Sequence, residues 1–97
     1  RPKAVRNVKA KATKKGIRIT WKKVSGANGY YIYRSTKKKS GYKKIHVVKK
    51  GKTQSYLDKK ARKGKTYYYK IRTYKKAGGK KMQSNWSKVV RKKYKNS

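Results

Sequence analysis

Tyrosine and basic side chains alternate along two segments of this sequence, and together they are the residues best suited to chemistry. Tyr31 and Tyr33 alternate in the first segment, and alternate positions of the second hold Tyr68, Lys70, Arg72 and Tyr74. Aromatic rings stack on bases or sugars, at about 1 to 3 kcal/mol for a base, and ammonium groups displace the counterions condensed on a polyanion. The pattern therefore predicts non-covalent binding of an anionic polymer.

Lysines at strand ends and loop tips extend this predicted surface. The candidate polyanion-binding residues are Tyr31, Tyr33, Lys43, Tyr68, Lys70, Arg72, Tyr74, Lys75, Lys76, Lys80 and Lys81. A simpler interpretation is the alternative: tyrosine is common at outward positions of strands, and the aliphatic stems of lysines cover its rings. Lysine outnumbers arginine, 28 to 7, which favours diffuse attraction over bidentate reading of phosphates or base edges. Any nucleic-acid binding should therefore be independent of sequence.

Catalytic and metal-binding chemistry lacks the residues that it needs. Asp58 is the only acid, whereas glycosidase chemistry takes two carboxylates, and we expect it to accept backbone or hydroxyl hydrogen bonds at the turn that follows. His46 is the only imidazole, and it alternates with Ile45 and Val47, so we expect it to face solvent. There are no cysteines. We predict no enzyme activity, no metal site and no cofactor.

The side chains above lie on segments that are predicted to be short strands separated by glycine-containing turns. Apolar residues recur at alternate positions and no helical period is present. The sequence predicts an all-β, antiparallel two-sheet sandwich in one domain over 1–97, with 91–97 as a partly disordered tail. The seven predicted strands cover 5–12, 17–22, 30–34, 42–48, 55–58, 66–74 and 84–90.

The charge of the chain is extreme. Lysine and arginine number 35 against one acid, for a formal net charge of +34, and the mean hydropathy is −1.33. These values alone are typical of disorder, but the alternating pattern outweighs them. No apolar run approaches the roughly 18 residues of a membrane span. The chain opens with Arg1-Pro2 and without a signal-peptide pattern, so we expect a piece of a longer or processed protein.

Several segments together resemble a bacterial fibronectin type III domain, and they cover nearly the whole chain. The resemblance implies an immunoglobulin-like sandwich in which Trp21 is a core residue and the Tyr67 hydroxyl bonds back to the backbone near Ala61. Ala61 itself, and Lys63 before Gly64, depart from the usual pattern. The matching segments are Ile17 to Trp21, Ser25 to Ser35, Tyr42 to Ile45, Ser55 to Asp58, Gly64 to Arg72, and Trp86-Ser87.

Lysine-rich domains of this kind resemble modules of secreted and cell-wall proteins of Gram-positive bacteria. The resemblance and the charge lead us to expect an extracellular or cell-wall-associated binding or spacer module, monomeric within a larger multidomain protein. Expected partners are teichoic acid, acidic polysaccharides, glycosaminoglycans and nucleic acid, with an anionic membrane surface as a further candidate. The alternative is a structural linker or scaffold, natural or engineered, whose charge serves solubility.

Overall fold

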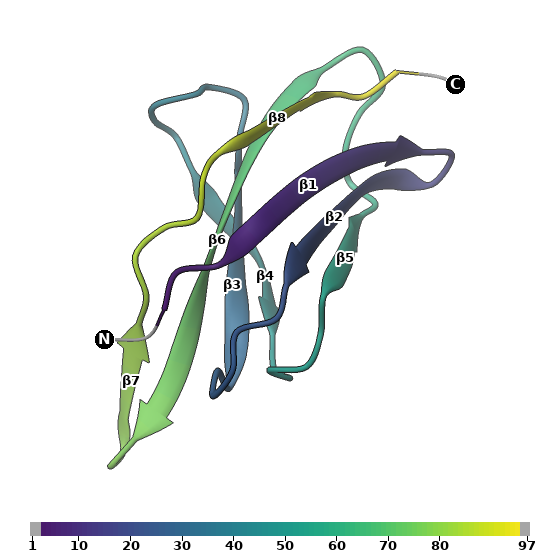
Figure 1. The fold of residues 1–97 in the computed structure, drawn as a ribbon. Helices are drawn as coiled ribbons and strands as arrows, with labels where there is room; N and C mark the ends of the chain where they lie inside the picture. The colour runs from purple at the N-terminus through teal and green to yellow at the C-terminus, as the bar shows by residue number, and fades with distance from the viewer. Residues whose placement is uncertain (1–2, 96–97) are drawn as a thin grey trace.

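The computed structural model describes residues 3–95, and over this range it has eight strands and no helix. One sheet has the order β1-β2-β5, and the other has the order β4-β3-β6-β7, with β8 also paired to β6 (Figure 1). Every pairing is antiparallel. The strands are β1 (Arg6–Thr13), β2 (Gly16–Lys22), β3 (Gly29–Ser35), β4 (Lys43–Val48), β5 (Ser55–Asp58), β6 (Thr66–Ala77), β7 (Lys80–Gln83) and β8 (Val90–Lys93).

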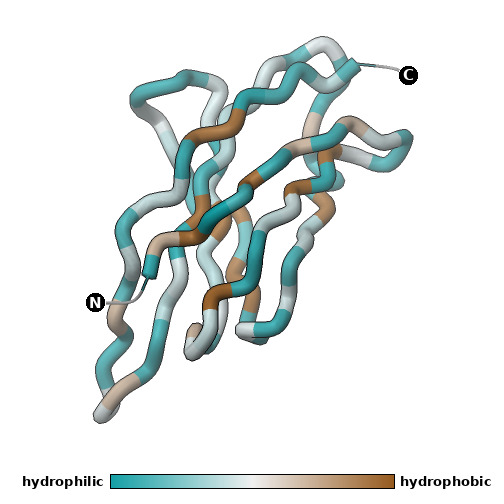
Figure 2. The backbone as a smooth tube through the Cα atoms, viewed as in Figure 1, coloured by the Kyte–Doolittle hydropathy of each residue, from teal (hydrophilic) through white to brown (hydrophobic). Residues whose placement is uncertain are grey.

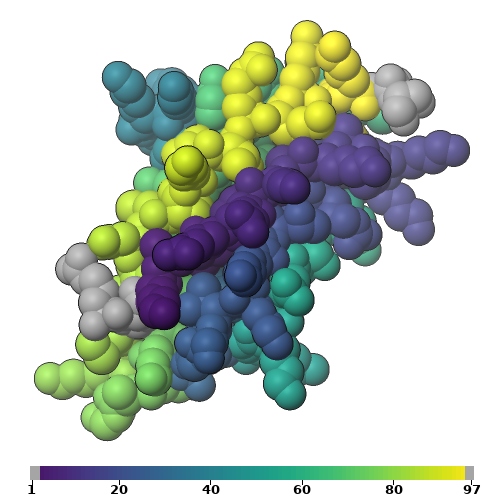
Figure 3. Space-filling model, viewed as in Figure 1, coloured from purple at the N-terminus to yellow at the C-terminus, as the bar shows by residue number. Residues whose placement is uncertain are grey.

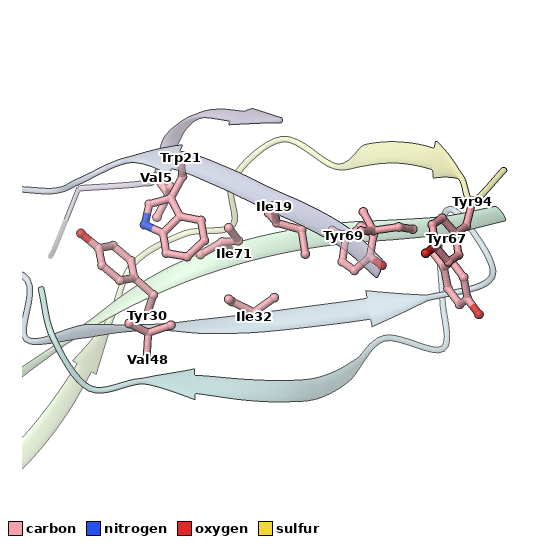
Figure 4. Close-up of a cluster of buried hydrophobic side chains, with 11 residues drawn as sticks. Val5, Ile19, Trp21, Tyr30, Ile32, Val48, Tyr67, Tyr69, Ile71 and Tyr94 are labelled. Carbon is pink, nitrogen blue, oxygen red and sulfur yellow. The ribbon is translucent and has the colours of Figure 1, made fainter. Parts of the chain in front are cut away.

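The predicted all-β two-sheet sandwich is confirmed, and hydrophobic positions alternate with polar ones along its strands (Figure 2). The inward positions are strongly buried: Ile19, Ile32 and Ile71 are each 0% exposed. Full burial of such a side chain stabilises the fold by about 1.5 to 3 kcal/mol. Trp21 is a core residue, as the resemblance implied, and its ring lies 5.4 Å from that of Tyr30. Figure 4 shows this pair at one end of the core and Tyr67 with Tyr94 at the other.

The strand count differs from the prediction because residues 84–89, which were expected to be strand, form an irregular link between the short strands β7 and β8. β7 pairs with the end of β6 and β8 with its beginning, whereas one continuous strand was expected over 84–90. In the link between them, the hydroxyls of Ser84 and Ser87 accept hydrogen bonds from the backbone N–H groups of Thr73 and Ile71, both at 2.9 Å. The two serines return the bond, since their own N–H groups donate to the carbonyls of Thr73 and Ile71. Side-chain hydroxyls therefore satisfy buried donors of β6 that a continuous strand would satisfy with carbonyls.

The alternation of β4 was also predicted incorrectly. The register between β3 and β4 shifts between Ile32 and Tyr33, so β4 has one extra residue there. Val48 is consequently the buried valine, at 7% exposure, instead of Val47. His46 is exposed as predicted, but its ring stacks on that of Tyr56 in β5, with 4.2 Å between centroids.

The C-terminal segment is ordered further than the predicted tail. Residues 90–93 form β8, and Tyr94 is only 4% exposed, with its hydroxyl donating to the Thr13 carbonyl at 2.8 Å. Of the tail over 91–97 that was expected to be partly disordered, residues 91–94 are placed by β8 and by this buried ring, which ties the segment to β1. Figure 3 shows β1 running across the molecule beside this segment. Residues 96–97 lie outside the described range.

A tyrosine hydroxyl closes the connection between β5 and β6, as the resemblance implied. The Tyr67 hydroxyl accepts a hydrogen bond from the backbone N–H of Arg62 at 2.8 Å, one residue beyond Ala61. Tyr67 itself is 4% exposed. The departures at Ala61 and Lys63 do not prevent this contact.

Candidate polyanion-binding face

The predicted tyrosines and cations lie on the outer face of the sheet that contains β3 and β6, which we call the outer face. Tyr31 and Tyr33 alternate on β3 with the core residues Tyr30 and Ile32. In the register of β3 and β6, Tyr31 lies opposite Arg72 and Tyr33 opposite Lys70. Residues on the same face of paired strands contact one another. The predicted cluster of β3 and β6 side chains is therefore assembled in the structure.

Trp86 organises the centre of the outer face. The Lys70 ammonium lies 3.9 Å from the Trp86 ring centroid and 4.3 Å from that of Tyr42. The Arg72 guanidinium lies 4.2 Å from the Trp86 centroid and 5.5 Å from that of Tyr33. Each cation is thus held between two rings, an arrangement that attracts it by about 0.5 to 2 kcal/mol per contact. We call these five residues the cation–ring ladder.

Two of the expected rings are covered. Tyr31 and Tyr74 are stacked on each other, with centroids 4.8 Å apart, and they are only 5% and 4% exposed. The ammonium groups of Lys44 and Lys81 lie over these rings, at 4.4 and 5.6 Å from the centroids. The expectation that both rings offer open stacking faces was therefore wrong, because neighbouring rings and lysine stems occupy those faces.

The remaining predicted aromatic positions keep partial exposure. Tyr33 and Tyr68 are half-buried, and Tyr33 meets the edge of Trp86 in a T-shaped contact at 4.6 Å. The outer face therefore presents mainly cations that aromatic rings hold in position. It presents fewer ring faces that are open to stack on a ligand.

Lysines of the β6–β7 hairpin extend the outer face. Lys75, Lys76, Lys80 and Lys81 are all exposed, and Lys76 lies directly opposite Lys81 in the register of the two strands. Gly78 and Gly79 form the tip with φ values of 57° and 80°, a backbone conformation that favours glycine. The hairpin projects at the lower left of Figure 1. Lys81 links it to the ladder side of the sheet through its contact with Tyr74.

Lys43 is not placed as predicted. It lies opposite Arg34 in the register, and it lines a groove between the two sheets, while its neighbour Lys44 lies over Tyr31. Sequence reasoning missed Lys44, Tyr42 and Trp86. Trp86 lies in the link between β7 and β8, which Ser84 and Ser87 bond to β6, so the alternation of a strand could not predict its position.

The two cations of the ladder lie in an environment that opposes their charge. Burial lowers the pKa of Lys70 below its ordinary value, and the positive charge of Arg72 lowers it further, against an opposing effect of Tyr33. The Nε of Arg72 is buried and has no hydrogen-bond partner. A negative charge placed against these two cations would raise the pKa of Lys70 back toward its ordinary value.

Asp58 joins the two sheets. It is 2% exposed, and it accepts hydrogen bonds from Arg34 Nη1 at 3.0 and 2.8 Å, from the Tyr69 hydroxyl at 2.7 Å and from the Lys60 N–H at 3.2 Å. The predicted backbone and hydroxyl donors are confirmed, whereas the partner Arg34 was not foreseen. Burial lowers the pKa of Arg34, but its hydrogen bond and charge interaction with Asp58 outweigh this and leave it raised.

Residues 3–95 lack two features that other functions would need. No group of three or more His, Cys, Asp or Glu side chains in this range is arranged to hold a metal ion. Nor does this range contain a helix with the length and apolar character to cross a membrane.

A family model described as a fibronectin type III domain, SaeA third domain, matches residues 5–92. No curated protein matches the chain. Among solved structures, a fibronectin type III-like protein from Clostridium thermocellum is 25% identical with a TM-score of 0.71, covering 91% of this chain and 90% of that one.

Two other solved structures contain a similar unit within a longer chain. A β-1,2-glucanase from Parabacteroides distasonis is 26% identical with a TM-score of 0.78, and the match covers 100% of this chain but only 14% of the enzyme. The FN1–FN3 domains of chicken CNTN1 match with a TM-score of 0.78 at 15% identity, over 99% of this chain and 32% of that one. The second likeness shows the fold alone.

Proposed function

The chain belongs to the fibronectin type III family, whose domains are generally non-catalytic modules, and we propose that it is a cationic module that binds polyanions outside the bacterial cell. Domains of this family in bacterial surface proteins are often extracellular. Occurrence of similar units within longer chains supports a place in a larger multidomain protein. The proposed ligands are teichoic acid, acidic polysaccharides, glycosaminoglycans and sequence-independent nucleic acid.

The cation–ring ladder is the observation that carries this proposal. Lys70 and Arg72 are fixed between Tyr42, Trp86 and Tyr33, so little side-chain entropy remains to be lost when they bind an anion. Only one acid is present in the chain, and it is buried against Arg34, so the ladder and the hairpin lysines have no carboxylate to pair with. Their charge is available to an external polymer.

Heparin and duplex DNA binding at about 50 mM salt tests the proposal. We expect binding to both, with affinity that falls steeply as salt rises. In the double variant Lys70→Gln/Arg72→Gln, affinity should fall by roughly tenfold and the salt slope by about two phosphate equivalents.

The matched control is Lys14→Gln/Lys15→Gln, which removes the same charge from the exposed turn between β1 and β2. This control should weaken binding by roughly threefold or less, because it only reduces diffuse attraction. Absence of binding by the unmodified chain at low salt, or an insensitivity of that binding to salt, would refute the proposal.

A structural spacer is the second candidate, and the covered rings favour it. Tyr31 and Tyr74 are stacked on each other beneath lysine stems, so part of the charge serves to cover apolar surface and keep the module soluble. Equal effects of the ladder variant and the control variant would support this candidate. Substitution of Tyr31 or Tyr74 is a poor discriminator because their burial makes it destabilising, so Trp86→Ser and Tyr42→Ser are the better ring variants.

A further inference from the structure

A groove of about 680 Å³ opens between the two sheets, and it borders the outer face at Lys44, which lies over Tyr31. One side is formed by the end of β3, the loop after it and β4, and the other by the end of β5 and the turn after it; β4 and β5 are edge strands of their two sheets (Figure 1). This volume lies in the usual range for sites that hold small ligands, and it is too small for a nucleic-acid duplex. The groove is lined in part by Arg34, Lys43, Lys44, His46, Tyr56 and Lys60.

Arg34 is the fixed element of this groove. Both of its bonds to Asp58 come from Nη1, at 3.0 and 2.8 Å, so its Nη2 and Nε donors are not used by that carboxylate. The guanidinium also lies 5.1 Å from the ring centroid of Tyr67, and the Arg34 side chain keeps 23% of its surface exposed. A guanidinium that keeps donors unused by its carboxylate and remains partly exposed can still donate N–H bonds to an oxyanion.

The charge balance of the groove favours a negative ligand. Its lining has four cations and one carboxylate, and Arg34 already compensates that carboxylate, which leaves three lysines in excess. Lys43, Lys44 and Lys60 are all exposed. A polar ligand would also find the stacked rings of His46 and Tyr56 at the groove wall. The Tyr56 hydroxyl is a neutral donor at physiological pH, and burial raises its pKa further.

We propose that this groove is a second binding site, which takes one acidic sugar unit of a glycan by holding its oxyanion against Arg34, Lys43 and Lys60. The sugar ring would lie on an outer face of the stacked His46–Tyr56 pair, since the two facing sides cover each other, and that outer face would offer an apolar surface to its C–H groups. This inference deepens the proposed function and rests on it for the choice of an anionic polymer. It adds a discrete unit of recognition to the diffuse attraction of the outer face.

The chain supplies one spectroscopic reporter for each site. His46 is the only histidine, so its imidazole signals in an NMR spectrum report on the groove alone. Trp86 reports on the outer face through its indole signal, and the other tryptophan, Trp21, is in the core. A heparin-derived tetrasaccharide, titrated into the full chain at about 150 mM salt, should shift both sets of signals saturably.

Variants separate the groove from general electrostatics. Lys43→Gln/Lys60→Gln should weaken the titration followed at His46 by roughly tenfold, while Lys14→Gln/Lys15→Gln, with the same loss of charge, should change it by less than about twofold. Arg34→Lys keeps the positive charge but removes the forked N–H donors of the guanidinium, so it should also weaken binding of the tetrasaccharide. Thermal melting checks that this variant folds. The proposal is overturned if both lysine pairs weaken the His46 titration equally.

The choice of ligand gives the remaining outcomes. An oligogalacturonate carries carboxylates only and inorganic phosphate carries no sugar, so their affinities relative to the tetrasaccharide identify the preferred oxyanion. Duplex DNA should shift the Trp86 signal and leave His46 unmoved, and an equal His46 shift with DNA would overturn the assignment to a glycan. If every glycan shifts the Trp86 signal and none shifts the His46 signals, the groove is not a binding site, and the proposed function still stands. Loss of all binding would remove both.

Discussion

Asp58 is expected to be the most sensitive single position for stability. Asp58→Ala leaves the Arg34 guanidinium, the buried Tyr69 hydroxyl and the Lys60 N–H without their shared acceptor. Breaking a buried ion pair by removing one partner costs about 3 to 5 kcal/mol, and we expect the lower end because the Arg34 side chain is 23% exposed. For a domain of this size, about 3 kcal/mol corresponds to a fall in Tm of roughly 12 to 24 °C.

Urea unfolding followed by tryptophan fluorescence is the suitable assay, since guanidinium chloride would screen the charge whose effect is being measured. Asp58→Asn is the matched variant, because its one carbonyl oxygen keeps an acceptor for either the Tyr69 hydroxyl or the Lys60 N–H, which use different oxygens of Asp58, and it loses the charge that faces Arg34. It should fall between the wild type and Asp58→Ala. Asp58→Asn/Arg34→Met removes both charges and should recover part of the loss. A cost below about 1 kcal/mol for Asp58→Ala would refute the claim that this carboxylate holds the sheets together.

Three further predictions concern stability. Ser84→Ala and Ser87→Ala should each cost about 1 to 3 kcal/mol in urea unfolding, because Thr73 and Ile71 lose the acceptors of buried N–H groups, whereas the exposed Ser25→Ala should cost almost nothing. The Tm should rise with sodium chloride over the range of about 10 to 200 mM, and a Tm independent of salt would show that the +34 charge does not oppose folding. Burial, followed by its hydrogen bond to Asp58, raises the pKa of Tyr69 above the ordinary value of 10.0, so its contribution to stability is complete below pH 10 and is lost as pH rises further. Tyr69→Phe should show a weaker alkaline loss when unfolding is followed against pH.

The sandwich could be predicted because its inward positions follow the period of a strand. Ile17, Ile19 and Trp21 on β2 alternate with polar residues, and so do the core residues of β6, and all of them are buried as expected. Side chains of β3 and β6 lie together on one face, and this also follows from the alternation of side chains along each strand, combined with the strand pairing of the family. These features depend on local pattern, which a single sequence carries.

The remaining features depend on contacts between segments that have no periodic signal. An extra residue in β4 moved the buried valine to Val48, since one inserted position reverses the alternation. Trp86 reached the ladder through a link whose course depends on the hydroxyls of Ser84 and Ser87. Covering of the Tyr31 ring by Lys44 depends on how long side chains pack across strands. None of these follows from residue type and spacing alone.

Burial of the single carboxylate has a consequence for encounters between copies of this protein. Because Asp58 is 2% exposed and the net charge is +34, a surface acid is lacking to oppose the cations that two approaching copies carry. We therefore expect charge repulsion to oppose direct contact between copies, and an anionic chain of the proposed kind to favour it. Along such a chain, the copies would be spaced by charge matching and would condense or disperse according to the ratio of polymer to protein and to the salt concentration.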